Sequence, residues 1–262
     1  MIAHPDHSVN ATILLASASP RRRELIKLLG LPVETTAADI DEVPLPGERA
    51  GEMAKRLSRE KAQTASALIP ACPFATGEAG RQAQPSSLPV SSPLARRAAG
   101  RILLASDTVV SLDGEPLGKP RDAVEARSML RRLRGRTHQV YTAITLIDLR
   151  TDRSITDLAC SNVPMRNYTD EEIEAYIASG DPFDKAGAYA IQHNGFRPVE
   201  NFSQCYANVM GLPLCHVTRS LRKSGVDVTN DVPVLCQAHI CYECPVFESI
   251  LKSEESHGEA SH

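Results

Sequence analysis

The sequence lacks any long apolar run, and it lacks a strong net charge. No stretch approaches the roughly 18 apolar residues that a membrane-spanning helix needs, so we expect no membrane segment. The 29 Lys and Arg residues against 32 Asp and Glu residues give a formal net charge of −3. Because this balance attracts neither nucleic acid nor anionic lipid to the whole surface, we expect neither as a partner. Any binding of anions must then depend on local groups.

Several familiar motifs are missing as well. The first ten residues lack a basic start followed by an apolar core, so we expect no signal peptide. The seven cysteines are odd in number, which fits reduced thiols in the cytoplasm better than a disulfide framework. There is no Walker-type glycine loop, no dinucleotide-binding fingerprint and no Ser-His-Asp arrangement that spacing supports. These absences disfavour ordinary ATPases and nicotinamide-dependent enzymes.

The composition is that of a globular protein with one irregular insertion. At 262 residues and 42% hydrophobic content, the chain can bury a core as one domain or two small ones. Residues 70–100 are rich in Pro, Ser, Ala and Arg without periodicity, and they predict a mobile insertion. We place the main domain at 11–223 and an extension of unknown role at 224–262. The extension carries four candidate zinc ligands, although their tight spacing makes buried or idle thiols the default: Cys236, His239, Cys241 and Cys244.

The most informative stretch is an apolar strand followed by a basic helix start. Residues 12–16 are short, apolar and partly β-branched, which predicts a strand buried on both faces. Ser19 occupies the position of a helix N-cap, and Pro20 follows at the first helical position. Three arginines in that first turn oppose the helix dipole unless an anion lies there. The stretch predicts a phosphate site, and the alternative is a solvated basic patch.

Two lysines and one aspartate occupy positions where ligand chemistry is expected. Lys61 lies on the apolar stripe of a predicted helix over 48–68, where it needs a partner unless its stem snorkels. Asp107 follows an apolar strand over 102–106, and ends of buried strands commonly position ligands, although a strand-end cap is the alternative. Lys119 is linked to Asp107 by one hairpin, so it either shares that pocket or faces solvent.

The remaining pattern predicts an α/β protein. We expect helices over 122–133 and 169–180, the second with a capping box, and a last helix from 210–214 to about 223. We expect strands over 31–35, 138–148 and 154–163. Residues 180–192 are expected to form a loop that enters a strand in its second half. Leu68 and Val124 are expected on the inward stripes of their helices.

Two groups of charged residues suggest phosphate chemistry. Cations that bind phosphates, with carboxylates that hold a divalent metal such as Mg²⁺, are the minimum for metal-assisted phosphoryl chemistry. The cationic group is Arg21, Arg22, Lys61 and Lys119, with Lys185 as a possible addition. The acidic group is Asp41, Glu42, Asp107, Asp181 and Asp184. From the residues alone, we expect a phosphate-handling α/β enzyme.

Four motifs in order resemble those of the Maf family over about 13–221. They are Ser17-Ala18-Ser19-Pro20-Arg21-Arg22, Ser106-Asp107-Thr108-Val109-Val110, Gly118-Lys119-Pro120 and the stretch from Asp184 to Gln192. Members of this family are nucleoside triphosphate pyrophosphatases, which cleave between the α and β phosphates. The resemblance implies an elongated mixed sheet flanked by helices, with two lobes and a central cleft, related to inosine triphosphatases. It also implies a homodimeric cytoplasmic enzyme that uses Mg²⁺ or Mn²⁺.

The resemblance further implies a role for each matching residue. Asp107 matches the catalytic aspartate, and whether it acts mainly as a base or as a metal ligand stays open. Glu42 matches the acidic residue near the metal. We expect the metal to connect the triphosphate to Glu42 and Asp107. The matches to substrate-binding residues are Ser17, Arg21, Arg22, Lys61 and Lys119. The subfamily acting on dTTP and UTP is similar in having Arg21, Thr108 and Gln192, and a glutamine amide can donate to and accept from a uracil or thymine edge at once.

The sequence therefore predicts a house-cleaning enzyme that hydrolyses dTTP or UTP to the monophosphate and pyrophosphate. Modified pyrimidine nucleotides are further candidate substrates. The alternative is a regulatory protein of septum formation and cell division that acts mainly by binding partners. A nucleotidyltransferase would use the same groups but needs a second acceptor pocket, for which the sequence offers no candidate. The insertion and the extension depart from the family pattern without removing any motif residue.

Overall fold

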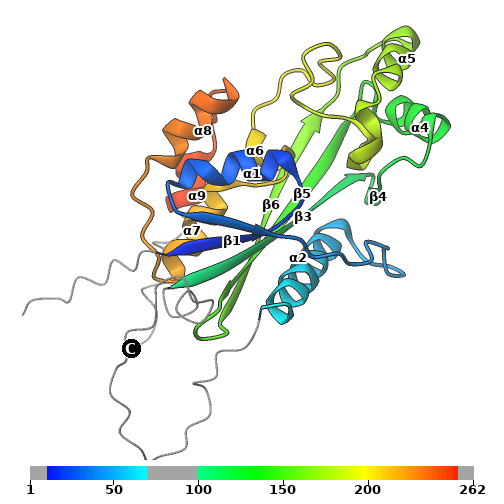
Figure 1. The fold of residues 1–262 in the computed structure, drawn as a ribbon. Helices are drawn as coiled ribbons and strands as arrows, with labels where there is room; N and C mark the ends of the chain where they lie inside the picture. Colours follow the sequence, from blue (N-terminus) through cyan, green and yellow to red (C-terminus); the bar gives the residue numbers. More distant parts are fainter. Residues whose placement is uncertain (1–10, 70–99, 253–262) are drawn as a thin grey trace, which may run out of the picture.

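The structure is a computed structural model that describes residues 11–69 and 100–252. Apart from Gly100, the predicted insertion lies outside the described residues, as does the end of the extension from residue 253. Within the described residues the chain forms a six-stranded mixed sheet with helices on both faces, which confirms the predicted fold class (Figure 1).

The sheet has the order β2-β1-β3-β5-β6, and β4 pairs with the far end of β3. β1 runs parallel to β2 and β3, whereas β3, β5 and β6 are antiparallel neighbours, as is β4 to β3. Asp113 and Gly114 both have positive φ at the β3–β4 turn, as a two-residue hairpin requires. The strands are β1 Thr12–Ala16, β2 Val33–Thr36, β3 Arg101–Leu112, β4 Glu115–Leu117, β5 Thr137–Asp148 and β6 Ser154–Pro164.

Helices cover both faces of this sheet unequally. α2 lies across one face, over β3, β5 and β6, whereas α1, α7 and α8 gather on the opposite face at one end, and α4 and α5 lie at the other end (Figure 1). The helices are α1 Pro20–Ile26, α2 Ala50–Ala67, α4 Ala123–Leu133, α5 Asp170–Ala178, α6 Tyr206–Val209, α7 Leu214–Lys223, α8 Val232–Ile240 and α9 Phe247–Lys252. Short 3₁₀ turns are Lys27–Leu29, Asp181–Asp184 and Ala186–Ala188.

The two largest hydrophobic cores of the described residues define two lobes that share β3, and two smaller ones lie under α2. The first core packs Leu25 of α1 and Leu221 of α7 against the first half of β3, including Leu104. The second core packs Leu130 of α4 against the second half of β3, including Val110. The amphipathic pattern of the helices therefore places a lobe at each end of one long strand.

The extension continues the first lobe. α8 begins at Val232, which is fully buried in the same core as β1, and Asp231 caps this helix by accepting a hydrogen bond from the Val234 N–H. The helix that ends at Lys223 was predicted to be the last, and this is wrong because α8 and α9 follow it. α7 begins at Leu214, within the predicted 210–214, with Pro213 as its N-cap.

Most predicted elements are confirmed, including the capping box of α5. Three other local expectations are wrong. Leu68 and Val124 are 67% and 70% exposed, because Leu68 lies beyond the end of α2 and Val124 lies outside the buried stripe of α4. Residues 189–192 form no strand, since the Ala190 N–H donates to the Tyr176 hydroxyl instead of a sheet ladder. The predicted N-cap position of Ser19 is confirmed, although its hydroxyl makes no capping hydrogen bond to α1.

Candidate active site

A single cavity of about 390 Å³ collects all nine residues for which the family resemblance implied a role in binding substrate or metal. The turn after β1, the start of α1, the loop before α2, α2 itself, β3 and the loop after β4 each contribute to its wall. These residues are Ser17, Arg21, Arg22, Glu42, Lys61, Asp107, Thr108, Lys119 and Gln192. The cavity lies between the two lobes, as the predicted central cleft requires.

The cavity opens where one edge of β3 has no strand beside it. β1 pairs with β3 only as far as Ala16 opposite Ala105, and β4 takes over at Leu117 opposite Val110. Between these points, no described strand pairs with that edge. Asp107 was expected at a strand end and instead lies in the middle of β3. It nevertheless lies just past the carboxyl end of β1, which is why it reaches the cavity.

Side-chain alternation along β3 aims neighbouring residues at different walls. Asp107 and Val109 point toward α2, where Val109 packs against the helix and Asp107 meets Lys61. Thr108 points to the other face and contacts Arg22 of α1. One short stretch of strand therefore supplies both a carboxylate and a hydroxyl to the same cavity from opposite faces of the sheet.

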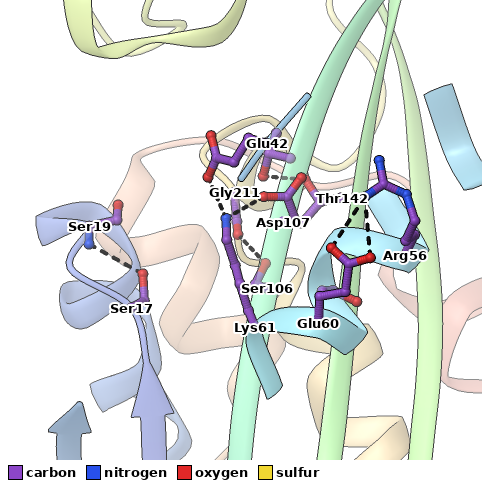
Figure 2. Close-up of polar contacts among 12 residues, drawn as sticks. Ser17, Ser19, Glu42, Arg56, Glu60, Lys61, Ser106, Asp107, Thr142 and Gly211 are labelled. Carbon is purple, nitrogen blue, oxygen red and sulfur yellow. Dashed lines mark hydrogen bonds and ion pairs between the residues drawn. The ribbon is translucent and has the colours of Figure 1, made fainter. Parts of the chain in front are cut away.

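Lys61 has two carboxylate partners. Its Nζ lies 2.5 Å from Asp107 Oδ1 and 2.6 Å from Glu42 Oε1 (Figure 2). The side chains of Lys61 and Asp107 are only 11% and 7% exposed, so the lysine does not snorkel to solvent. Lys119 lies 3.0 Å from Glu42 Oε2 and is half-exposed. Asp41 is exposed and does not line the cavity, so Glu42 is the acidic residue that joins the site.

The two lysines keep Glu42 ionised. Partial burial pushes the pKa of Glu42 upward, but hydrogen bonds and charge from Lys61 and Lys119 outweigh this effect and lower the pKa to about 2. The charged residues of the cavity wall comprise five cations and three carboxylates. This excess of positive charge suits a polyanionic ligand.

Most hydrogen-bond donors of the Arg22 guanidinium are used within the protein. Its Nε donates to the Gly211 carbonyl at 2.8 Å, its Nη1 to the Ser106 carbonyl at 2.8 Å, and its Nη2 to the Thr108 hydroxyl at 3.0 Å. Burial lowers its pKa, although Asp107 and Glu42 act in the opposite direction. Gly211 has a φ of 102°, and a Cβ there would lie 3.2 Å from Arg22 Nε, so this approach needs glycine.

Arg21 differs from its neighbour. Among the residues that the structure describes, Arg21 makes no ion pair, and it lines the cavity. Ser17, which is 6% exposed, accepts a hydrogen bond from the Ser19 N–H at 3.2 Å and so shapes the turn between them. Arg21 is therefore a cavity-lining cation whose donors have no partner within the described residues and can turn to a ligand.

The sequence analysis assigned no role to Tyr189 of the cavity wall or to its partner His138, and the role expected of Lys185 needs correction. Tyr189 lines the cavity, and its hydroxyl shares a 2.8 Å hydrogen bond with Nε2 of the buried His138. Lys185, considered a possible phosphate ligand, has all three ammonium donors occupied by Asp181 and Asp184. The 51-residue separation of Tyr189 and His138 left no local signal for their contact.

The carboxylates of Glu42 and Asp107 fit a divalent metal. Both reach the same ammonium nitrogen, so their oxygen atoms lie close together at the cavity wall. Mg²⁺ commonly binds one or two carboxylates and completes its shell with water and substrate phosphate oxygens. The donor set is therefore of the right kind and number for an ion that arrives with a nucleotide.

The four candidate zinc ligands of the extension do not converge. Cys236 and Cys244 line a small apolar cavity with Cys205 and Cys215, whereas His239 and Cys241 are exposed. Over residues 11–69 and 100–252, no group of three or more His, Cys, Asp or Glu side chains could hold a metal ion. In the same ranges, every helix is too short or too polar to cross a membrane.

The sequence matches the profile of the Maf-like protein family over residues 12–224. It is 43% identical over 225 residues to a protein of Chromobacterium violaceum named dTTP/UTP pyrophosphatase, covering 84% of this chain and 99% of the relative. A protein of the same name from Geobacter sp. (strain M21) is 39% identical over 216 residues, covering 82% of this chain and 97% of the relative.

A third relative extends past the family profile. The dTTP/UTP pyrophosphatase of Thermomicrobium roseum is 40% identical over 251 residues, covering 95% of this chain and all of the relative. That alignment therefore reaches into the C-terminal extension. Among solved structures, the Ham1 protein of Staphylococcus aureus matches with a TM-score of 0.38 and 13% identity, covering 87% of this chain and 97% of that one.

Proposed function

This chain belongs to the Maf-like family, and from that membership we propose that it hydrolyses dTTP and UTP to the monophosphate and pyrophosphate. The observation that carries the proposal is the convergence of Asp107, Lys61, Glu42 and Lys119 in one cavity between the lobes. Relatives about 40% identical over most of the chain carry the name of this activity. Nothing in the cavity favours a role limited to partner binding.

The cations would hold the triphosphate. Arg21 has free donors at the cavity wall, and Lys119 is half-exposed beside Glu42, so both can turn to phosphate oxygens. Lys61 is fixed between two carboxylates, and it can neutralise charge that develops at the reacting phosphate. Arg22 then acts mainly as the brace that ties α1 to β3 and to Gly211.

Asp107 would direct the water. Lys61 occupies one of its carboxylate oxygens, which holds the carboxylate in place and leaves the second oxygen to accept a hydrogen bond from water. The water oxygen adds to the α phosphorus, the bond from that phosphorus to the bridging oxygen breaks, and pyrophosphate leaves. The proton of the water passes to Asp107.

A divalent ion, Mg²⁺ or Mn²⁺, is part of this proposal. Glu42 and Asp107 would hold it, and it would neutralise phosphate charge when bound with the nucleotide. Lys61 keeps the two carboxylates together before any ligand arrives. The lowered pKa of Glu42 means that this residue presents a charged ligand throughout the physiological range.

Selectivity for thymine and uracil is proposed for Gln192. Its position on the cavity wall allows the side-chain amide to donate to one base carbonyl and accept from the ring N–H. Thr108, the other pyrimidine-associated residue, has its hydroxyl engaged with Arg22 and with Thr142. We therefore assign Thr108 an indirect part, through the orientation of Arg22.

The test is pyrophosphate release from UTP, dTTP, CTP, ATP and GTP with Mg²⁺, Mn²⁺ or EDTA. We expect turnover of UTP and dTTP that EDTA abolishes and that Asp107→Asn lowers at least about 100-fold. Asp113→Asn is the matched control, because Asp113 lies in the exposed β3–β4 turn and should leave activity unchanged. Turnover centred on purines would overturn the substrate assignment. No turnover by folded protein would favour the regulatory hypothesis.

The remaining expectations from the family belong to the same proposal. We propose a cytoplasmic homodimer that binds no nucleic acid. Light scattering after size exclusion tests whether the protein is a dimer. A mobility-shift assay with duplex DNA and RNA tests whether it binds nucleic acid. A monomer, or retention of nucleic acid at physiological salt, would overturn the respective statement.

A further inference from the structure

The far wall of the cavity is held in place without a sheet ladder. Residues 189–192, which we term the wall segment, all line the cavity and include Gln192. No strand pairs with the wall segment among the described residues. Its placement must therefore come from side chains.

Two side-chain hydrogen bonds hold the wall segment among the described residues: the Tyr189 hydroxyl bonds to His138, and Tyr176 of α5 bonds to the backbone of Ala190. The Tyr176 hydroxyl accepts a 3.0 Å hydrogen bond from the Ala190 N–H and donates one of 2.6 Å to Asp181 Oδ2. The ring of Tyr176 stacks on that of Phe196 with a centroid separation of 4.4 Å. It meets the His193 ring in a T-shaped arrangement with a centroid separation of 4.7 Å. The side chain is 2% exposed, so neither the ring nor the hydroxyl can swing away to solvent.

Lys185 binds the same aspartate as Tyr176 and so extends the hydrogen-bond network. Its ammonium group donates to the Asp181 carbonyl at 2.6 Å, to Asp181 Oδ1 at 2.9 Å and to Asp184 Oδ1 at 2.6 Å. Both oxygens of the Asp181 carboxylate are thereby fixed, one by Lys185 and the other by Tyr176. The side chain of Lys185 is 7% exposed. Tyr176 and Lys185 are buried, whereas the side chains of Asp181 and Asp184 are 31% and 71% exposed. The buried part of this network is fully paired, which favours a single arrangement.

We propose that Tyr176, Asp181 and Lys185 are positioning residues that set the base selectivity of the cavity by fixing the wall segment. This inference rests on the proposed function, because it concerns the nucleobase of the same substrate. Displacing the wall segment moves the Gln192 amide relative to a base whose recognition needs donor and acceptor in register. The phosphate-binding cations come from other elements, so phosphate binding and the chemical step should be affected less.

The chain offers a matched control for the loss of the Tyr176 hydroxyl. Tyr168 is 1% exposed, belongs to the same core and also contacts the ring of Phe196. Its hydroxyl donates to the Leu130 carbonyl of α4 at 2.7 Å and does not reach the wall segment. Both Tyr→Phe changes remove one buried hydroxyl and its hydrogen bonding, but only one of them releases the Ala190 N–H.

The experiment compares Tyr176→Phe, Asp181→Asn and Tyr168→Phe with the wild type. For each protein, kcat and KM are measured for UTP and CTP. Tyr176→Phe should raise KM for UTP about five-fold and lower the preference for UTP over CTP, with kcat changed less than about two-fold. Asp181→Asn should act in the same direction. Tyr168→Phe should lower the Tm without changing the preference.

A second measurement does not depend on turnover. Native-state hydrogen exchange should show faster exchange of the Ala190 amide in Tyr176→Phe and unchanged exchange there in Tyr168→Phe. If exchange at Ala190 is unchanged, or if both tyrosine variants alter the base preference equally, the network is only structural and the inference is wrong. If the wild type releases no pyrophosphate but Ala190 exchanges faster, the proposed function fails while the positioning contact stands.

Discussion

The ammonium group of Lys61 lies 2.5 Å from the carboxylate of Asp107, and both side chains are buried where the two lobes meet. The same ammonium contacts Glu42, so one cation from α2 holds together two carboxylates from different segments of the chain. Removing the cation would leave Asp107 buried without an opposite charge, which is costly in a desolvated site.

Lys61→Met should therefore damage stability and catalysis together. We expect kcat/KM for UTP to fall by about 100-fold or more, and the free energy of unfolding to fall by about 3 kcal/mol. Pyrophosphate release and urea denaturation measure the two effects. Lys55→Met on the exposed side of the same helix removes only a surface pair with Glu52 and serves as control. A variant of Lys61 with wild-type turnover would contradict its assigned place in the site.

The adjacent arginines should separate binding from stability. Arg21→Lys should raise KM for UTP several-fold with an unchanged Tm, because the Arg21 guanidinium makes no ion pair among the described residues. Arg22→Lys should lower the Tm by several degrees as well as kcat/KM, because lysine cannot replace three directed hydrogen bonds to Gly211, Ser106 and Thr108. Differential scanning fluorimetry and steady-state kinetics test both. The same Tm loss in both variants would refute the division of labour.

Glu42 should make folding stability depend on acid pH. Its pKa is lowered from 4.5 to about 2 in the folded protein, so its stabilising contribution is fully present above about pH 4.5. It is lost as the pH falls toward 2, because the carboxylate becomes protonated in both states. Urea titrations of the wild type and Glu42→Gln from pH 6 to pH 2.5 should converge as the pH falls. Adding Lys119→Met should weaken this pH dependence, since it removes one of the two cations responsible.

Cys244 should be the most reactive thiol of the cavity that four cysteines share. The neighbouring Cys205 thiol lowers the pKa of Cys244 below its usual range despite partial burial, with help from the backbone N–H groups of Val246 and Phe247. Iodoacetamide should thus alkylate Cys244 at a lower pH than Cys236, whose pKa burial raises, as peptide mass spectrometry can follow. Cys205→Ala should move the pH of half-maximal Cys244 alkylation upward. An unchanged midpoint would show that Cys205 does not control this thiol.

Local signals predicted much of the fold. The apolar run before Ser17, the Pro20 helix start and the capping box at Thr169 depend on neighbours in sequence, and the structure confirms each position. The resemblance to the Maf family also pointed to nine residues that line one cavity. Their roles as ligands of substrate and metal remain predictions.

What the sequence could not supply were contacts between distant segments. Arg22 was expected to face phosphate, yet its strongest commitments are to Gly211, 189 residues later, and to β3. Lys185 was grouped with the phosphate ligands because its charge is visible in the sequence. Its hydrogen bonds to Asp181 and Asp184 depend on how the turn folds, which the sequence does not show. The unpaired edge of β3 depends on where β1 stops and β4 starts, which only the register decides.

The sharing of β3 by both lobes has a mechanical consequence. A hinge between the lobes would have to bend β3 near Asp107, and there it is bonded to β5 along ten consecutive residue pairs, while β5 is bonded in turn to β6. Bending one strand would break ladder bonds in three. The continuous sheet therefore holds the two lobes in a fixed relative orientation. We expect adjustment to a nucleotide to come from the loop that carries Glu42 and from the side chains of the cavity wall.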